Sequence, residues 1–145
     1  SSMSVSAWVR LNQINVDQRI LFKSHSAGPL ESWKFYINAS NIPSFEVANT
    51  ISGYFIASGP AVNNNTWYHI VGVKNGNSLS LYTNGVLGGT QDTVTGTVQD
   101  GDGNLLMGNI TDGTKQLKGQ LDDVRVYGRA LTATEISTLF TNGQK

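Results

Sequence analysis

One stretch decides the fold of this chain: GQLDDVRVYGRALTATEI, residues 119–136. Its first half alternates with a period of two, which predicts a strand. The two faces of that strand would carry Leu121, Asp123, Arg125 and Tyr127 on one side and Asp122, Val124 and Val126 on the other. In the second half, Thr132 and Glu135 have the spacing of a capping box, and Leu131 and Ile136 flank it as a hydrophobic staple does. The stretch therefore predicts a strand that leads directly into a short amphipathic helix.

The length and composition fit one domain and exclude several kinds of chemistry. A chain of 145 residues can bury a full core. Its net charge is zero and only 14% of its residues are charged, which argues against nucleic-acid binding driven by Lys and Arg. The absence of cysteine excludes disulfides, thiolate nucleophiles and cysteine-bound zinc. No apolar run approaches the roughly 20 residues that span a bilayer, so we expect no membrane insertion.

The rest of the chain reads as short strands joined by turns. Asn75 and Gly76 tolerate the positive φ of a tight hairpin turn, and apolar alternation continues on both sides of them. Turn signals recur about every 8–12 residues, which is typical of an all-β sandwich. The expected strands are residues 4–11, 19–24, 33–39, 44–48, 54–57, 67–74, 79–82, 105–108 and 117–127. The fold class predicted is an antiparallel β-sandwich with one short C-terminal helix.

Three segments together resemble a known family. They are SVSAWV (4–9), TWYHIV with LSLYTNG (66–71 and 79–85), and the opening stretch at 119–136. In this order they resemble the bacterial laminin-G-like modules of the concanavalin A-like jelly rolls, over nearly the whole chain, 1–145, as a single domain. The resemblance implies an extracellular or cell-surface location, and a glycan or an extracellular protein as partner.

The start of the chain departs from the family pattern. Family members carry one or two strands ahead of the Ser-Ala-Trp strand, and the first of these pairs with the closing strand. Here there is no room for them, so we expect either a trimmed chain or an open sheet edge beside residues 121–127. Because an unpaired edge strand recruits another chain, this edge predicts a homo-oligomer.

Catalytic pairs are not apparent in the sequence. Glycosidases on this architecture use two carboxylates about 5–9.5 Å apart. None of Glu31, Glu46 and Glu135 has an acidic partner at that spacing, and strict alternation places Asp122 and Asp123 on opposite faces. No Gly-x-Ser-x-Gly motif occurs, and His69 lies inside an apolar strand. We therefore predict no enzyme activity, and a glycoside hydrolase or lyase stays as the less favoured alternative.

One loop has the opening spacing of a calcium site. Asp100, Asp102 and Asn104 place oxygen-bearing side chains two residues apart. The remainder of an EF-hand is missing, because Leu105 and Thr111 stand where Gly and Glu are needed. The family resemblance implies calcium at a rim loop, and the alternative is a simple glycine-rich turn.

Aromatic side chains are the candidates for ligand binding. An aromatic ring can stack on the C–H face of a sugar while amides and charged groups take its hydroxyls. The candidates are Trp33, Tyr36 and Tyr54, with His25 in a polar loop; for Trp33, a place in the core is favoured over a ligand platform. Tyr36 faces opposite to Trp33, so only one of the two can line a given surface. The predicted function is a non-catalytic recognition or adhesion module that binds glycan. The alternative is a structural, self-assembling or protein-interaction module.

Overall fold

The computed structural model describes residues 2–24, 31–49, 53–91, 93–98, 101–110 and 112–145. Within them the chain forms strands and one C-terminal helix, α1 (Ala133–Asn142). The strands are β1 (Ser2–Leu11), β2 (Gln18–Ser24), β3 (Glu31–Ile37), β4 (Pro43–Asn49), β5 (Gly53–Ser58), β6 (Trp67–Asn75), β7 (Ser78–Thr83), β8 (Val86–Gln91), β9 (Leu105–Met107) and β10 (Gly119–Tyr127).

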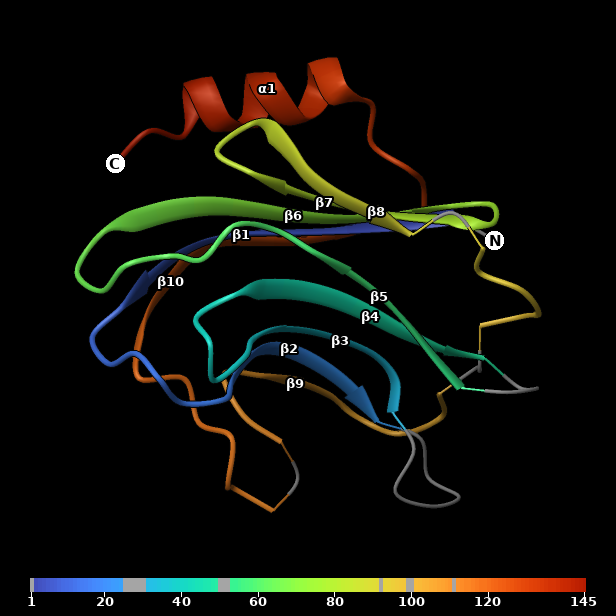
Figure 1. The fold of residues 1–145 in the computed structure, drawn as a ribbon, viewed down its shortest axis with the longest axis horizontal. Helices are drawn as coiled ribbons and strands as arrows, with labels where there is room; N and C mark the ends of the chain where they lie inside the picture. Colours follow the sequence, from blue (N-terminus) through green and yellow to red (C-terminus); the bar gives the residue numbers. More distant parts are fainter. Residues whose placement is uncertain (1, 25–30, 50–52, 92, 99–100, 111) are drawn as a thin grey trace.

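The strands build two five-stranded antiparallel sheets that face each other. The first sheet has the order β10-β1-β6-β7-β8, and the second has the order β5-β4-β3-β2-β9. Figure 1 shows the two layers, with α1 lying across the first sheet on the side away from the second. The predicted β-sandwich with one short C-terminal helix is confirmed.

The core fills the space between the sheets. Alternation along β1 turns Val5, Ala7 and Val9 inward, where they join a buried cluster with Phe35 and Phe45. The two phenylalanine rings meet edge to face with centroids 6.3 Å apart. The sheets approach so closely that a Cβ at Gly72 would lie 2.5 Å from the Phe45 ring, so only glycine fits there.

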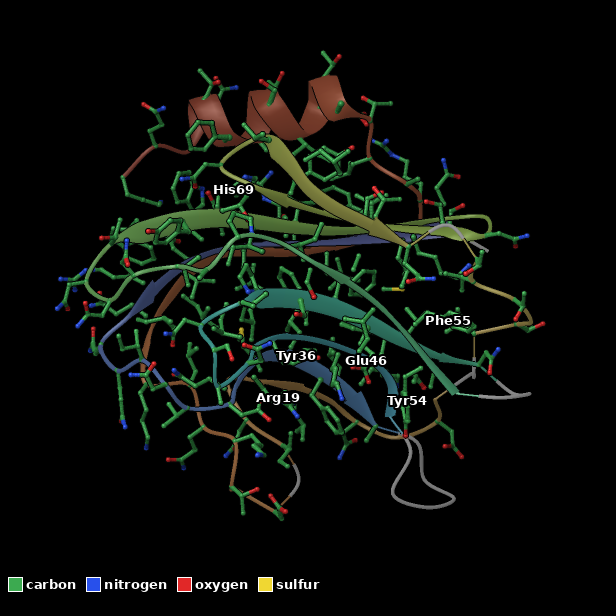
Figure 2. All side chains as sticks on the ribbon, in the orientation of Figure 1. Arg19, Tyr36, Glu46, Tyr54, Phe55 and His69 are labelled. Atoms are coloured by element: carbon green, nitrogen blue, oxygen red, sulfur yellow. The ribbon has the colours of Figure 1, made fainter. Side chains whose placement is uncertain are left out.

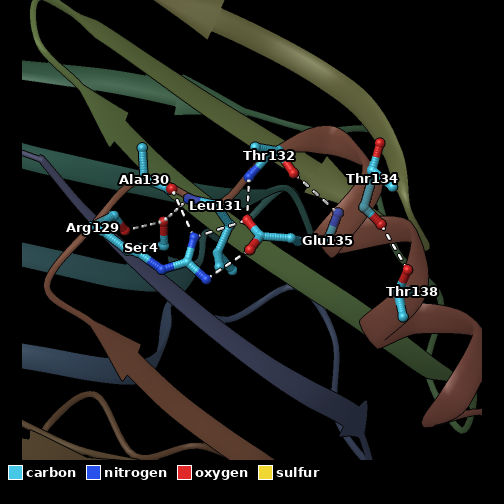
Figure 3. A network of polar contacts seen from close by, with 8 residues as sticks. All are labelled: Ser4, Arg129, Ala130, Leu131, Thr132, Thr134, Glu135 and Thr138. Atoms are coloured by element: carbon cyan, nitrogen blue, oxygen red, sulfur yellow. Dashed lines mark hydrogen bonds and ion pairs between the residues drawn. The ribbon is translucent and has the colours of Figure 1, made fainter.

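The predicted helix start is confirmed in detail (Figure 3). The amide of Glu135 donates to the Thr132 hydroxyl at 3.2 Å, and the amide of Thr132 donates to the Glu135 carboxylate at 2.8 Å. Arg129 adds an ion pair to that carboxylate at 2.7 Å. Behind the cap, Leu131 and Ile136 are both buried in one apolar cluster on the first sheet, as the staple requires.

The strict alternation predicted for residues 121–127 was wrong. β10 carries a bulge in its pairing with β1: Trp8 pairs with Asp122 and Ser6 with Arg125, so two residues of β10 oppose one of β1. Asp123 adopts a positive φ of 49° there. The two adjacent aspartates therefore do not point to opposite faces. Asp122 pairs with Lys145 beyond α1, and Asp123 lines a pocket under the same end of the helix.

β10 forms one edge of the first sheet, as the open-edge prediction requires. Its only hydrogen-bonded neighbour among the described strands is β1. Val126 shows how open this side is, because it pairs with the buried Val5 and yet remains 49% exposed. In the described part of the chain, no helix combines the length and apolarity needed to cross a bilayer.

Candidate ligand-binding face of the second sheet

The predicted aromatic residues lie on two different sides of the second sheet. Trp33 faces the core, is 8% exposed and packs 6.4 Å from Phe45, so it offers no surface to a ligand. Tyr36 and Tyr54 lie on the outer face, away from the first sheet, as the period of two dictates for β3 and β5. His25 lies outside the described residues.

Polar side chains from four neighbouring strands meet on this outer face. Tyr36 pairs with Arg19 of β2, Lys34 pairs with Glu46 of β4, and the alternation continues to Tyr54 of β5. We call these five residues the outer strip. Figure 2 shows four of them, Arg19, Tyr36, Glu46 and Tyr54, on the opposite side of the molecule from His69 and α1.

A buried carboxylate lies at the centre of the outer strip. Glu46 is only 3% exposed, and burying a carboxylate is costly unless it is paired and hydrogen-bonded. Lys34 places its ammonium 2.7 Å from one carboxylate oxygen, and the Tyr36 hydroxyl donates to the other at 3.1 Å. The carboxylate is therefore held in one position on the face of the sheet.

The Tyr36 ring lies between two cations. The Arg19 guanidinium is 4.8 Å and the Lys34 ammonium 5.1 Å from the ring centroid, both within cation–π range. Burial, followed by the negative charge of Glu46, raises the pKa of Tyr36 to about 12. The phenol therefore stays neutral and acts as a donor to Glu46 at any physiological pH.

Tyr54 is the accessible aromatic residue of the outer strip. It is 45% exposed, and Ile56, two residues along the same face of β5, is 43% exposed. The Lys34 ammonium lies 5.5 Å from the centroid of the Tyr54 ring. The same ammonium forms the ion pair with Glu46. An exposed ring beside fixed polar groups is the arrangement that stacks on a sugar and binds its hydroxyls.

At the other end of the outer strip, Arg19 connects to a polar pocket at the rim of the sandwich. Arg19 donates to Asp17, whose second oxygen lies 3.2 Å from the Lys115 ammonium. The pocket has a volume of about 220 Å³ and is lined by Gln13, Val16, Asp17, Gly113, Thr114, Gln116 and Lys118. The face and the rim pocket are therefore continuous through Asp17.

The predicted calcium loop has a structural explanation for its glycines. A Cβ at Gly101 would lie 2.0 Å from the Ser32 hydroxyl, and one at Gly103 would lie 2.3 Å from that of Ser24. The Lys23 ammonium donates to the Gly103 carbonyl. The described residues contain no cluster of three His, Cys, Asp or Glu, and Asp100 lies outside them. Asp102 and Asn104 remain predictions as calcium ligands.

Sequence reasoning missed Arg19, Lys34 and Glu46. Lys34 and Glu46 each alternate with buried aromatics, Trp33 and Phe35 on β3 and Phe45 on β4, so the period alone places both on the outer face. That signal was present in the sequence. The pairing of β2 beside β3, which brings Arg19 to Tyr36, has a register shift between Arg19 and Leu21 that no sequence pattern announces.

The sequence matches a known family over most of its length. The model of the concanavalin A-like lectin/glucanases superfamily, in its laminin-G-like form, matches residues 1–137. The chain belongs to this superfamily. The expected laminin-G-like, concanavalin A-like jelly roll is thereby confirmed. No curated protein matches the sequence significantly.

Several solved structures share the fold at low sequence identity. The CBM40 domain of Ruminococcus gnavus IT-sialidase, bound to α2,3-sialyllactose, superposes with a TM-score of 0.77 at 18% identity, over 96% of this chain and 82% of that one. The heptameric SAP-like pentraxin of Limulus polyphemus gives 0.75 at 20% identity, over 96% and 69%. Trypanosoma rangeli sialidase gives 0.72 at 17%, over 98% of this chain and 23% of the other.

Proposed function

We propose that this laminin-G-like domain is a non-catalytic module that binds glycan on the outer strip. The observation that carries the proposal is the exposed Tyr54 ring beside Lys34 and Glu46, two charged groups held in place by each other. The ring supplies an apolar platform, and the Lys34 ammonium, held in place by Glu46, supplies a donor for sugar hydroxyls. Because these groups are ordered before a ligand arrives, binding does not have to immobilise them.

The length of the outer strip suits an oligosaccharide. Arg19 and Tyr54 lie on β2 and β5, which are three strand spacings apart in the second sheet. With neighbouring strands about 4.8 Å apart, the outer strip extends roughly 14 Å. A single sugar would contact one end of it, whereas a chain of sugars would reach both Tyr54 and the rim pocket next to Arg19.

The structural relatives support recognition of a glycan. The CBM40 domain with this fold binds sialyllactose, and it is a binding module that accompanies a sialidase. Fold alone does not give function, so the contact residues of the outer strip carry the argument for this chain. An extracellular or cell-surface location and a role in adhesion are part of the same proposal.

The chemistry of the outer strip favours binding over hydrolysis. Among the described side chains of the second sheet's strands, Glu46 is the only carboxylate. Its oxygens are taken by Lys34 and Tyr36, and a glycosidase needs a second carboxylate about 5–9.5 Å away. Calcium at Asp102 and Asn104 remains a separate prediction, and a rise in melting temperature on adding calcium would support it.

The second candidate function is self-assembly through β10. The observation that favours it is the combination of an edge strand with the half-exposed Val126. An edge strand can add a strand of a second copy by backbone hydrogen bonds. Sedimentation over a wide concentration range separates the two: oligomers that form with no glycan bound support assembly, and a monomer at every concentration rejects it.

A glycan array on the intact chain and on Tyr54→Ala tests the glycan proposal. We expect defined hits for the intact chain and loss of those hits in the variant, which lacks the platform. Val126→Ala is the matched control, because it removes a side chain of similar exposure from the other sheet. Hits that survive in Tyr54→Ala, or an array without hits, would reject binding on the outer strip.

A further inference from the structure

We propose that the ligand of the outer strip is an acidic glycan, whose anionic group lies beside Lys34 and Arg19. This inference rests on the proposed glycan-binding function and adds the charge of the ligand.

Arg19 has more hydrogen-bond donors than partners, whereas the carboxylate oxygens beside it already accept hydrogen bonds or form ion pairs. The two oxygens of Glu46 already accept from Lys34 and Tyr36, and those of Asp17 face Arg19 and Lys115. Arg19 carries five N–H groups. One of them, Nε–H, is buried and has no partner among the described residues. The Arg19 end of the outer strip therefore carries more donors than acceptors, which favours a ligand group that only accepts.

The charges of the outer strip point the same way. Arg19 and Lys34 contribute two positive charges, and Glu46 contributes one negative charge. At the rim, Asp17 pairs with both Arg19 and Lys115, so the three cations and two carboxylates of the face and rim leave a net charge of +1. Two like charges, Arg19 and Lys34, also share one aromatic ring at 4.8 and 5.1 Å, and an anion close to both relieves their repulsion.

Exposure decides which groups touch the ligand first. The Lys34 and Lys115 side chains are 15% and 37% exposed, so both can be reached from solvent. Arg19, at 8%, lies deeper, with its guanidinium 4.8 Å from the centroid of the Tyr36 ring. A planar guanidinium with a fixed orientation matches the planar oxygens of a carboxylate and also binds sulfate. The shared chemistry is therefore an anionic group on a sugar.

Matched ligand pairs on an array test the inference. Each neutral oligosaccharide stands beside the same oligosaccharide carrying a uronic acid, a sialic acid or a sulfate, and each carboxylate also appears as its methyl ester. We expect the acidic member of the best pair to bind at least about tenfold tighter than the neutral member. This difference in affinity should become smaller as salt is added. Preference for carboxylate or for sulfate identifies the source of the anionic group. Esters that bind as well as the free acids, with no preference for sulfate, would overturn the inference and leave glycan binding intact.

Two variants locate the effect on the outer strip. Arg19→Gln removes the guanidinium, and Lys115→Gln removes an exposed rim cation whose loss leaves the buried contacts of Arg19 with Tyr36 in place. Lys145→Gln is the matched control, because it removes one positive charge on the far side of the sandwich, beside Trp8. Both test variants should reduce the difference in affinity between the free acid and its methyl ester, and the control should leave that difference unchanged. If the difference in affinity between acid and ester is unchanged in Lys115→Gln and in folded Arg19→Gln, the inference is rejected. If the intact chain binds no glycan at all, the proposed function itself is rejected.

Discussion

The outer faces of the two sheets are built in opposite ways. On the first sheet, α1 covers the face, and Trp8, His69 and Phe140 pack as a row of rings with centroid distances of 5.2 Å and 5.8 Å from Trp8. On the second sheet, no described helix covers the face, and its centre is filled by the ion pair of Lys34 and Glu46 with the Tyr36 ring. The apolar outer face is covered and serves stability, whereas the charged one is left accessible and is the face on which we propose that glycan binds.

Loss of the helix contact should give the largest effect. Ile136 of α1 is fully buried and packs in one apolar cluster with Val71 and Val73 of β6. Ile136→Ala should lower the free energy of unfolding by about 3 kcal/mol, because it removes buried methylene groups and leaves a cavity. Urea unfolding measures this, with Thr138→Ala on the exposed side of α1 as control. An equal loss in both variants would contradict the view that α1 is held by its apolar face.

Lowering the pH should give the next largest loss of folding stability, through His69 on the covered face of the first sheet. Burial, followed by the positive charge of Arg125, lowers the pKa of His69 to about 4, from 6.5 in the unfolded chain. Its contribution to stability is complete above pH 6.5 and is lost as pH falls to about 4, because only the unfolded state binds the proton in that window. The full loss is about 3 kcal/mol. Unfolding measured from pH 7 to pH 4 should show this slope, and His69→Gln should flatten it; an equal slope in the variant would contradict the assignment.

Removing the charge of Glu46 should destabilise the protein by a smaller amount, through the outer face of the second sheet. Glu46→Gln leaves the Lys34 ammonium facing a neutral group in a half-buried place and should cost about 2 kcal/mol. The double variant Lys34→Met with Glu46→Leu should regain much of that stability, since it removes both charges, and it should no longer bind glycan. A single variant as stable as the intact chain would mean that the ion pair does not hold the face together.

The helix cap should give the smallest effect on stability. Thr132→Ala removes the hydroxyl that accepts from the Glu135 amide and should cost about 1 kcal/mol. Ser137→Ala, further along α1, is the control. Glycan binding on the second sheet should be unchanged in both variants, and a loss of binding in Thr132→Ala would show that the two faces are coupled.

Local sequence signals predicted the elements whose causes are local. The capping box at Thr132 and Glu135 and the turn between β6 and β7 involve neighbouring residues only, so both were readable, although Gly76 alone of the expected pair has a positive φ and Asn75 ends β6. β8 was missed because Gly88 and Gly89 weaken its strand signal; they are needed because a Cβ at Gly89 would lie 2.2 Å from the Ser58 carbonyl oxygen of β5.

The candidate site was only half predictable for the same reason. Tyr36 and Tyr54 were identified as aromatic candidates, but the choice between core and surface for Trp33 depends on which face of β3 packs against the first sheet. The groups that hold the outer strip together, Arg19 and Glu46, come from strands whose pairing is set by tertiary contacts. The bulge at Asp123 is likewise a property of the β1–β10 pair and not of either strand alone.

NMR mapping of the bound ligand shows which of the two outer faces holds it. Amide resonances of the intact chain are followed while the best oligosaccharide from the array is added. The account predicts that the largest shifts fall on Lys34, Glu46 and Tyr54 of the second sheet, with those around Trp8 and His69 unchanged. Shifts concentrated at Trp8 and His69 beneath α1 would contradict it.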